Sequence, residues 1–218
     1  MRLFLASQDF GNFGDKLSEM VGDNRRALVI FNARDYKDDR GIEGQKELFS
    51  GIGLEFNELD LRNYFGRKNE LRRFIDKFKP GLVVLLGGNT FLLRRALAQS
   101  GFDEILTEDI KADKYVYAGH SAGSMIVAPS MEGYERHDNE KVIMPGYDLG
   151  VIWSGLNLVD IRIIPHVSAD KYREKIVSMR RELFDRKGWR YELLEDEDVF
   201  IIDGEKEIVL RGGLNGAN

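Results

Sequence analysis

The chain has 218 residues, 43% of them hydrophobic, with a formal net charge of -5 and no cysteine. These values suit one α/β domain, and they exclude disulfides, thiolate metal ligands and a cysteine nucleophile. The negative charge, without a dense lysine or arginine stripe, argues against a nucleic-acid partner. No apolar run approaches the roughly 18–20 residues of a membrane span, and nothing resembles a signal peptide, so we expect a cytoplasmic protein without membrane contact.

Strand-like and helix-like segments alternate along the first half of the chain. The predicted strands are residues 3–6, 27–31, 54–59 and 82–86, and the helices between them are 15–21, 44–50 and 68–78. In the last of these helices, Leu71, Phe74, Ile75 and Phe78 recur at helical spacing on one face. The run LVVLL at 82–86 is apolar on both faces, which is typical of a central parallel strand covered by helices.

The alternation continues and then becomes β-rich. We predict helices at 91–98 and 101–110, a strand at 115–118, an irregular polar segment at 130–150, a strand at 159–164, the longest helix at 169–184, and three short strands within 191–210. Alternating elements indicate a doubly wound, mostly parallel sheet flanked by helices. We expect a single α/β domain over 1–211, with a short β-rich C-terminal part, and a flexible tail at 212–218. Arginine pairs such as Arg180-Arg181 are interpreted as solvated faces.

The pentapeptide GHSAG at 119–123 directly follows the strand predicted at 115–118. The pattern G-x-S-x-G at a strand-to-helix turn is typical of a nucleophile elbow, in which strained backbone geometry lifts the serine hydroxyl clear of the sheet. Glycines two residues before and after the serine prevent collisions across the turn. Ser121 is therefore the candidate nucleophile.

A nucleophilic serine needs a base, and the chain has only three histidines. The His120 side chain should leave the elbow in a different direction from Ser121, so it can line the site but is a poor base. His137 lies in a charged loop, where a solvated histidine is the simpler interpretation. His166 follows the strand predicted at 159–164, and it shares an edge with Ser121 if that strand is parallel to 115–118. A histidine that only caps a strand end is the alternative.

The base needs an orienting carboxylate, and the reaction needs donors for the developing oxyanion. Glu195 is preferred as the carboxylate because it follows a strand-like run, and Asp138 is the alternative. The Ala122 amide comes with the elbow, and the Gly88 amide, at the end of the strand at 82–86, is the second predicted donor. We predict no metal and no cofactor, because there is no H-x-x-x-H motif, EF-hand spacing or nucleotide-binding glycine motif.

Four stretches carry a family resemblance: LLGGNTF at 85–91, AGHSAG at 118–123, IIPHVSAD at 163–170 and LLEDED at 193–198. Together they resemble the peptidase E family, the α-aspartyl dipeptidases of class S51, within the class I glutamine amidotransferase-like superfamily. The resemblance implies metal-free hydrolysis of dipeptides with an N-terminal aspartate. It implies Ser121 as nucleophile and His166 as base. Gly88 and Ala122 match the oxyanion donors, and Glu195 falls where the family's glutamate lies.

The chain departs from the family pattern in two places. Leu194 and Asp196 stand where peptidase E has proline and glycine, and the 130–150 segment differs. An aspartate after the elbow has also been considered as the third triad member in the family, and an ungapped count here lands on Arg136, with Asp138 nearby. The candidates for substrate binding are Asn89, His120, Arg136 and Asp138, and Arg173 is a further cation that could meet an aspartyl side chain.

The sequence thus predicts a metal-free serine dipeptidase with a Ser-His-Glu triad and an acyl-enzyme intermediate. Two alternatives stay open. One is an α/β-hydrolase-type esterase, in which Asp138 would be the acid, and the other is a non-catalytic amidotransferase-like binding module. The expected partner is a small peptide substrate, and a homodimer is left open.

Overall fold

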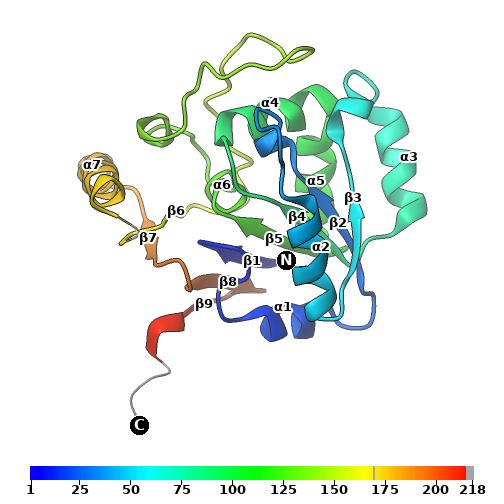
Figure 1. Cartoon of the computed structure of the whole chain (residues 1–218), viewed down its shortest axis with the longest axis horizontal. Coiled ribbons are helices and arrows are strands. Elements are labelled where there is room, and N and C mark those ends of the chain that lie inside the picture. The colour runs from blue at the N-terminus through cyan, green and yellow to red at the C-terminus, as the bar shows by residue number, and fades with distance from the viewer. Residues whose placement is uncertain (169, 215–218) are drawn as a thin grey trace.

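A seven-stranded sheet forms the centre of the molecule in the computed structural model, which describes residues 1–168 and 170–214 (Figure 1). The strand order is β3-β2-β4-β5-β1-β8-β9. Strands β1 to β5 run parallel, β8 is antiparallel to β1, and β9 is antiparallel to β8. The bounds are β1 Arg2–Ala6, β2 Arg26–Ile30, β3 Glu55–Glu58, β4 Leu82–Leu85, β5 Val116–His120, β8 Val199–Asp203 and β9 Lys206–Leu210.

Helices cover both faces of this sheet. The bounds are α1 Gly14–Val21, α2 Ile42–Gly51, α3 Lys68–Phe78, α4 Thr90–Ser100, α5 Phe102–Lys111, α6 Ala122–Met125 and α7 Lys171–Lys187, with short 3-10 helices η1 Asn32–Arg34, η2 Leu61–Tyr64, η3 Tyr134–Arg136 and η4 Gly212–Leu214. Alternate residues of β1 enter different cores: Leu3 and Leu5 pack with residues of α3, α4 and α5, and Phe4 and Ala6 pack with residues of α1 and α2. The predicted doubly wound, mostly parallel sheet is confirmed.

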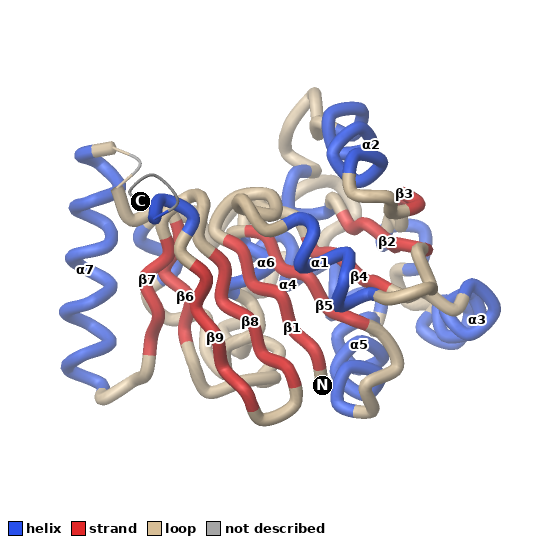
Figure 2. The backbone as a smooth tube through the Cα atoms, turned by 90° about the horizontal axis from the view of Figure 1, so that it is seen from below, coloured by secondary structure: helices blue, strands red, loops and turns tan. Residues whose placement is uncertain are grey.

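The strand β6 (Arg162–Pro165) does not join this sheet. It pairs in parallel with β7 (Tyr191–Leu194) in a separate two-stranded sheet. Helix α7 lies beside that pair, at the opposite end of the molecule from α2 and α3 (Figure 2). His166 was expected near Ser121 only if their two strands were parallel members of one sheet. The strands belong to different sheets, so other contacts bring the two residues together.

The irregular segment predicted at 130–150 is held down mainly by side chains of α4. The Arg95 guanidinium donates hydrogen bonds to the carbonyls of Glu140, Val142 and Gly150. The Tyr147 hydroxyl donates to Asp35, beyond the end of β2, at 2.6 Å. This segment therefore has a fixed position beside the carboxyl ends of the central strands, although it contains little regular structure.

The structure describes the first three residues of the predicted C-terminal tail, 212–214. Gly212–Leu214 form η4, and the Gly212 amide donates a hydrogen bond to Asp198 at 3.0 Å. The rest of the predicted tail, 215–218, and position 169 of the predicted long helix lie outside the described residues. Among the helices that the structure describes, none is long and apolar enough to cross a membrane.

Candidate active site

Ser121 lies between the end of β5 and the start of α6 in strained backbone geometry, with φ +50° and ψ -104°. Its amide donates to the Ala6 carbonyl at 3.1 Å, which ties the turn to the end of β1. A Cβ atom on Gly123 would lie 1.9 Å from the Leu85 carbonyl oxygen, and one on Gly119 would lie 2.6 Å from the Gly123 backbone. The glycines of the GHSAG motif are therefore required for the elbow to form against its neighbouring strand.

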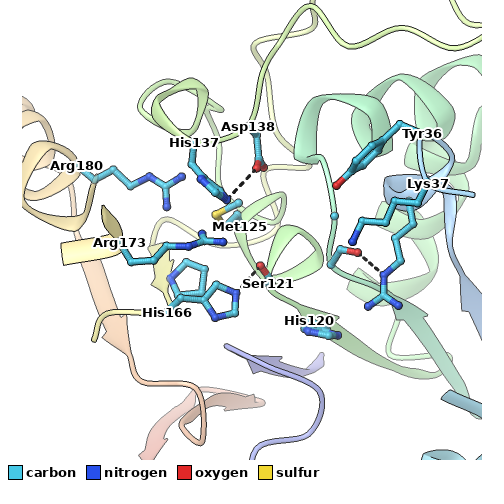
Figure 3. A pocket seen from close by; sticks show the side chains of 14 residues that line it. Tyr36, Lys37, His120, Ser121, Met125, His137, Asp138, His166, Arg173 and Arg180 are labelled. Atoms are coloured by element: carbon cyan, nitrogen blue, oxygen red, sulfur yellow. Dashed lines mark hydrogen bonds and ion pairs between the residues drawn. The ribbon is translucent and has the colours of Figure 1, made fainter. Parts of the chain in front are cut away.

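His166 reaches Ser121 from the two-stranded sheet. It follows β6, its φ is +60°, and its amide donates to the Ser7 hydroxyl at 2.9 Å just beyond the end of β1. Its Nε2 atom lies 3.0 Å from Ser121 Oγ. Figure 3 shows the imidazole beside the Ser121 side chain at the floor of a cavity. The hydrogen bond to Ser7 thus fixes the two sheets relative to each other at the point where nucleophile and histidine meet.

The carboxylate that holds the histidine ring belongs to Asp196. Its Oδ1 atom is hydrogen-bonded to His166 Nδ1. The Glu195 carboxylate instead accepts hydrogen bonds from the amide and hydroxyl of Ser168, at 3.1 and 2.8 Å. The structure thus places Asp196, rather than the predicted Glu195, against His166. Consecutive side chains after a strand point in different directions, so a shift of one residue exchanges the two carboxylates.

Asp138, the other predicted candidate for that position, lies elsewhere. One of its oxygens accepts hydrogen bonds from the amide of Thr90, at 3.0 Å, and from the Thr90 hydroxyl. Its carboxylate therefore caps the start of α4, and it makes no hydrogen bond to His166 within the described part of the chain.

The backbone amides of Gly88 and Ala122, near Ser121, donate to no backbone carbonyl in the described turns, loops and helix ends. Gly88 has φ +153°, and a Cβ there would lie 2.3 Å from the Ala33 carbonyl oxygen, so only glycine fits. Gly88 and Ser121 line the same cavity, and a Cβ on Gly87 would lie 3.0 Å from the Ser121 Cβ. Unpaired amides at a strand-to-helix turn are the kind of donor that stabilises an oxyanion.

The cavity above Ser121 and His166 has a volume of about 220 Å³, and four cationic side chains line it: Arg34, Lys37, Arg173 and Arg180. None of the four has a carboxylate within 4.0 Å in the part of the chain that the structure describes. The Arg180 guanidinium is buried on the carbonyls of Gly133 and Tyr134, and burial lowers its pKa. Asp138 is the only carboxylate among the lining residues. The cavity is therefore positive, in a protein whose net charge is negative.

His120 also lines this cavity and is 7% exposed. Its Nδ1 atom is buried without a hydrogen bond and lies 3.5 Å from an Asp9 carboxylate oxygen. Burial lowers the pKa of His120 to about 4, against a smaller opposing effect of Asp9. The ring is therefore neutral at pH 7.

The structure places the remaining predicted binding residues outside the cavity lining. Asn89 caps α4: its carbonyl oxygen accepts from the Leu92 amide and its amide donates to the Asn139 carbonyl, both at 2.9 Å. Arg136 is half exposed and lies 3.7 Å from Glu135. The interpretation of Arg180 as solvated is wrong, because this side chain is buried, and His137 lines the cavity with 27% of its side chain exposed. Tertiary neighbours, which local charge patterns do not encode, determine their positions.

Arg34 and Lys37, which line the cavity, were not predicted as site residues. They follow β2, whose carboxyl end lies at the same edge of the sheet as that of β4. Their positions directly after a parallel strand were the available signal. Within the described residues, no group of three or more histidine, aspartate or glutamate side chains is placed to hold a metal ion.

The sequence model of peptidase family S51 matches residues 3–209. The chain belongs to this family. An uncharacterized peptidase of Listeria monocytogenes is 30% identical over 163 residues, which cover 73% of each chain. An uncharacterized peptidase of Pasteurella multocida is 26% identical over 221 residues, which cover 99% of each chain. The recognition of an S51 peptidase from four short motifs is confirmed.

Solved structures share the fold. A crystal structure of a candidate peptidase E protein from Listeria monocytogenes superposes on this S51 peptidase with a TM-score of 0.74 and 24% identity, over 96% of this chain and 98% of the other. A peptidase from an acI-B1 actinobacterium gives a TM-score of 0.63 and 17% identity, over 97% and 94%. At these identities the likeness concerns the fold alone.

Proposed function

We propose that this S51 peptidase is a serine-type dipeptidase that acts through an acyl-enzyme. The observation that carries the proposal is the contact of 3.0 Å between Ser121 Oγ and His166 Nε2, with Asp196 on the opposite ring nitrogen. A neutral imidazole that donates its Nδ1 proton to Asp196 presents the Nε2 lone pair to the serine hydroxyl. Asp196 acts here as the orienting residue in place of the glutamate of a Ser-His-Glu triad.

Acylation follows from this arrangement. Ser121 Oγ attacks the scissile carbonyl carbon while its proton passes to His166 Nε2, and Asp196 stabilises the resulting imidazolium. The amides of Gly88 and Ala122 donate hydrogen bonds to the carbonyl oxygen as it gains negative charge. The carbon–nitrogen bond then breaks, and His166 returns the proton to the departing amine. The products of this half-reaction are a free amine and an ester on Ser121.

Deacylation repeats the chemistry with water as the nucleophile. His166 accepts a proton from a water molecule, whose oxygen attacks the ester carbonyl. The bond to Ser121 Oγ breaks, and the proton on His166 restores the serine hydroxyl. The released acid and the earlier amine are the two halves of the hydrolysed peptide, and the enzyme is unchanged.

We infer that the substrate is a small acidic peptide, with an N-terminal aspartate as the first candidate. A cavity of about 220 Å³ is small for a peptide-binding site and suits a short substrate. Cations without carboxylate partners in the described chain, such as Arg173 and Lys37, are matched by the carboxylates of an acidic peptide. The resemblance to α-aspartyl dipeptidases points to the same substrate class.

The test is a peptide panel, Asp-Leu against Glu-Leu, Asn-Leu and a short acyl ester, with wild type and the Ser121→Ala variant. We expect Asp-Leu to have the highest kcat/KM, and Ser121→Ala to lower kcat by about a thousandfold or more at unchanged thermal stability. Ser50→Ala, an exposed serine of α2, is the matched control and should behave as wild type. Ester turnover without peptide turnover, or full peptidase activity of Ser121→Ala, would contradict the proposal.

A further inference from the structure

The ionised groups around the cavity are unevenly distributed. Arg173 and Arg180 lie on the His166 side, and Lys37 lies on the opposite side (Figure 3). Among the described residues that line the cavity, Asp138 is the only one with a carboxylate. A positively charged group of a bound ligand is therefore repelled by most of the cavity wall and attracted to one place.

Asp138 is a fixed carboxylate. It is only 7% exposed, and one of its oxygens is held by the amide and hydroxyl of Thr90 at the first turn of α4. Both hydrogen bonds come from Thr90, the first residue of the eleven-residue helix α4, so a regular element anchors this oxygen. The carboxylate therefore keeps its position when a ligand enters.

The second oxygen of Asp138 has no hydrogen-bond donor among the described residues. The Nε2 atom of His137 lies 4.0 Å from this oxygen, which is too far for a hydrogen bond. Asp138 lines the cavity, and this oxygen is not one of the fully buried atoms that lack a hydrogen-bond partner, so it is accessible from the cavity. A donor-bearing ligand group can therefore reach it.

We propose that Asp138 binds the free α-ammonium group of the substrate, so that the enzyme requires an unblocked amino terminus. The inference rests on the proposed function, because it assumes that a short acidic peptide occupies this cavity. Asp138 would be a binding residue that selects the N-terminal residue of the substrate, and Asp196 would be the residue that orients the histidine. Asp138 would then bind the ammonium group of the substrate, and Asp196 would stabilise the imidazolium form of His166.

This assignment also explains why position 138 carries a carboxylate. Capping of α4 requires only an acceptor oxygen, which asparagine supplies equally well. The negative charge adds nothing to the hydrogen bond geometry with Thr90, but it adds attraction for an ammonium ion in a cavity that otherwise repels one. The substitution Asp138→Asn therefore separates the two roles, since it keeps the cap and removes the charge.

The experiment compares two ligands that differ only in the ammonium group. Succinyl-Leu is Asp-Leu with the α-ammonium group replaced by hydrogen, and it keeps both carboxylates and the scissile bond. In the Ser121→Ala background, which prevents turnover, calorimetry should show Asp-Leu binding about 10- to 100-fold more tightly than succinyl-Leu. Adding Asp138→Asn should bring the two dissociation constants close together, mainly by weakening Asp-Leu.

Two controls make the result specific. Asp148→Asn removes an exposed aspartate from the same irregular segment and should leave the ratio of dissociation constants unchanged. A measurement without any substitution at 138 uses pH: the α-amino group loses its proton around pH 8, so the ratio should fall toward one between pH 7 and pH 9.5. This second measurement stands even if Asp138→Asn fails to fold.

An unchanged ligand ratio in Asp138→Asn, equal binding of both ligands by the Ser121→Ala protein, or a ratio that does not change with pH would overturn the ammonium site. Failure of the proposed function looks different. In that case wild type would hydrolyse neither ligand, while the ratio of dissociation constants in the Ser121→Ala protein would still decide what Asp138 binds.

Discussion

The amide of His166 donates a hydrogen bond to the hydroxyl of Ser7 at 2.9 Å, across 159 positions of the chain. Ser7 is fully buried beyond the end of β1, and β1 belongs to the sheet that carries Ser121. His166 follows β6, which belongs to the other sheet, and its φ of +60° is unusual for a residue with a side chain. This hydrogen bond therefore holds the histidine in register with the nucleophile.

Replacing Ser7 by alanine should impair catalysis more than substrate binding. Without its acceptor, the His166 backbone can relax from the left-handed region, and the imidazole loses its fixed distance to Ser121. We expect kcat to fall about tenfold with KM nearly unchanged, as a displacement of the base predicts. Steady-state kinetics with Asp-Leu check this. Ser100→Ala, which removes another buried hydroxyl that bonds only at the end of α4 and the start of α5, should change stability but not kcat.

The two neighbouring carboxylates after β7 should respond very differently to loss of charge. Asp196→Asn removes the acceptor of the His166 Nδ1 proton, so that the wrong tautomer faces Ser121, and we expect kcat to fall by about a hundredfold or more. Glu195→Gln keeps an oxygen for Ser168 and should stay close to wild type. Labelling rates with a fluorophosphonate, compared with kcat, check both variants. A larger loss for Glu195→Gln would restore the predicted triad.

Gly88 should tolerate no side chain. A Cβ at this position would lie 2.3 Å from the Ala33 carbonyl oxygen, and the φ of +153° disfavours any L-residue. We expect Gly88→Ala to cost about 2–4 kcal/mol of unfolding free energy and to displace the amide proposed for the oxyanion. Gly44→Ala is the matched control, because it lies in α2 with nothing within 4 Å of its Cβ and should be neutral or stabilising. Denaturant unfolding and kcat measure both effects.

The fold and the nucleophile could be predicted because local patterns report them directly. All four residues of β4 are buried, as its uninterrupted apolar run indicates, and the elbow needs only glycines around Ser121. The pairing of β6 with β7 could not be predicted in this way, because the sequence of a short apolar strand does not determine which strand it pairs with. The same reason explains the misplacement of Arg180, which is buried by backbone carbonyls of Gly133 and Tyr134, 47 and 46 positions away.

The sequence predicted the correct acidic cluster for the carboxylate beside His166 but the adjacent residue within it, Glu195 in place of Asp196. The acidic cluster after β7 was predicted to supply the carboxylate, and the resemblance pointed to Glu195. Asp196 stands where peptidase E has glycine, so the chain offers a side chain at a position where the family pattern has none. Which of two adjacent carboxylates faces His166 depends on the direction of one side chain at a strand end, and composition and spacing do not determine that direction.

The buried His120 should make the protein less stable in mild acid. Burial lowers its pKa to about 4 in the folded protein, whereas an unfolded histidine titrates near 6.5, so the unfolded state binds more protons between these values. The contribution of His120 to stability is therefore fully present above pH 6.5 and is lost as the pH falls toward 4. At pH 4.5 this loss amounts to about 2 kcal/mol relative to pH 7.

A His120→Gln variant checks this linkage, because glutamine keeps a polar side chain beside Asp9 but does not titrate. Unfolding free energies from denaturant titration at pH 7 and pH 4.5 should differ by less in the variant than in wild type. Wild type and variant share every other titrating group, so the difference between their pH dependences isolates His120. Equal pH dependence in the two proteins would mean that position 120 titrates as it does in the unfolded chain. The ring would then be charged in mild acid beside Ser121, and the cavity would be still more positive.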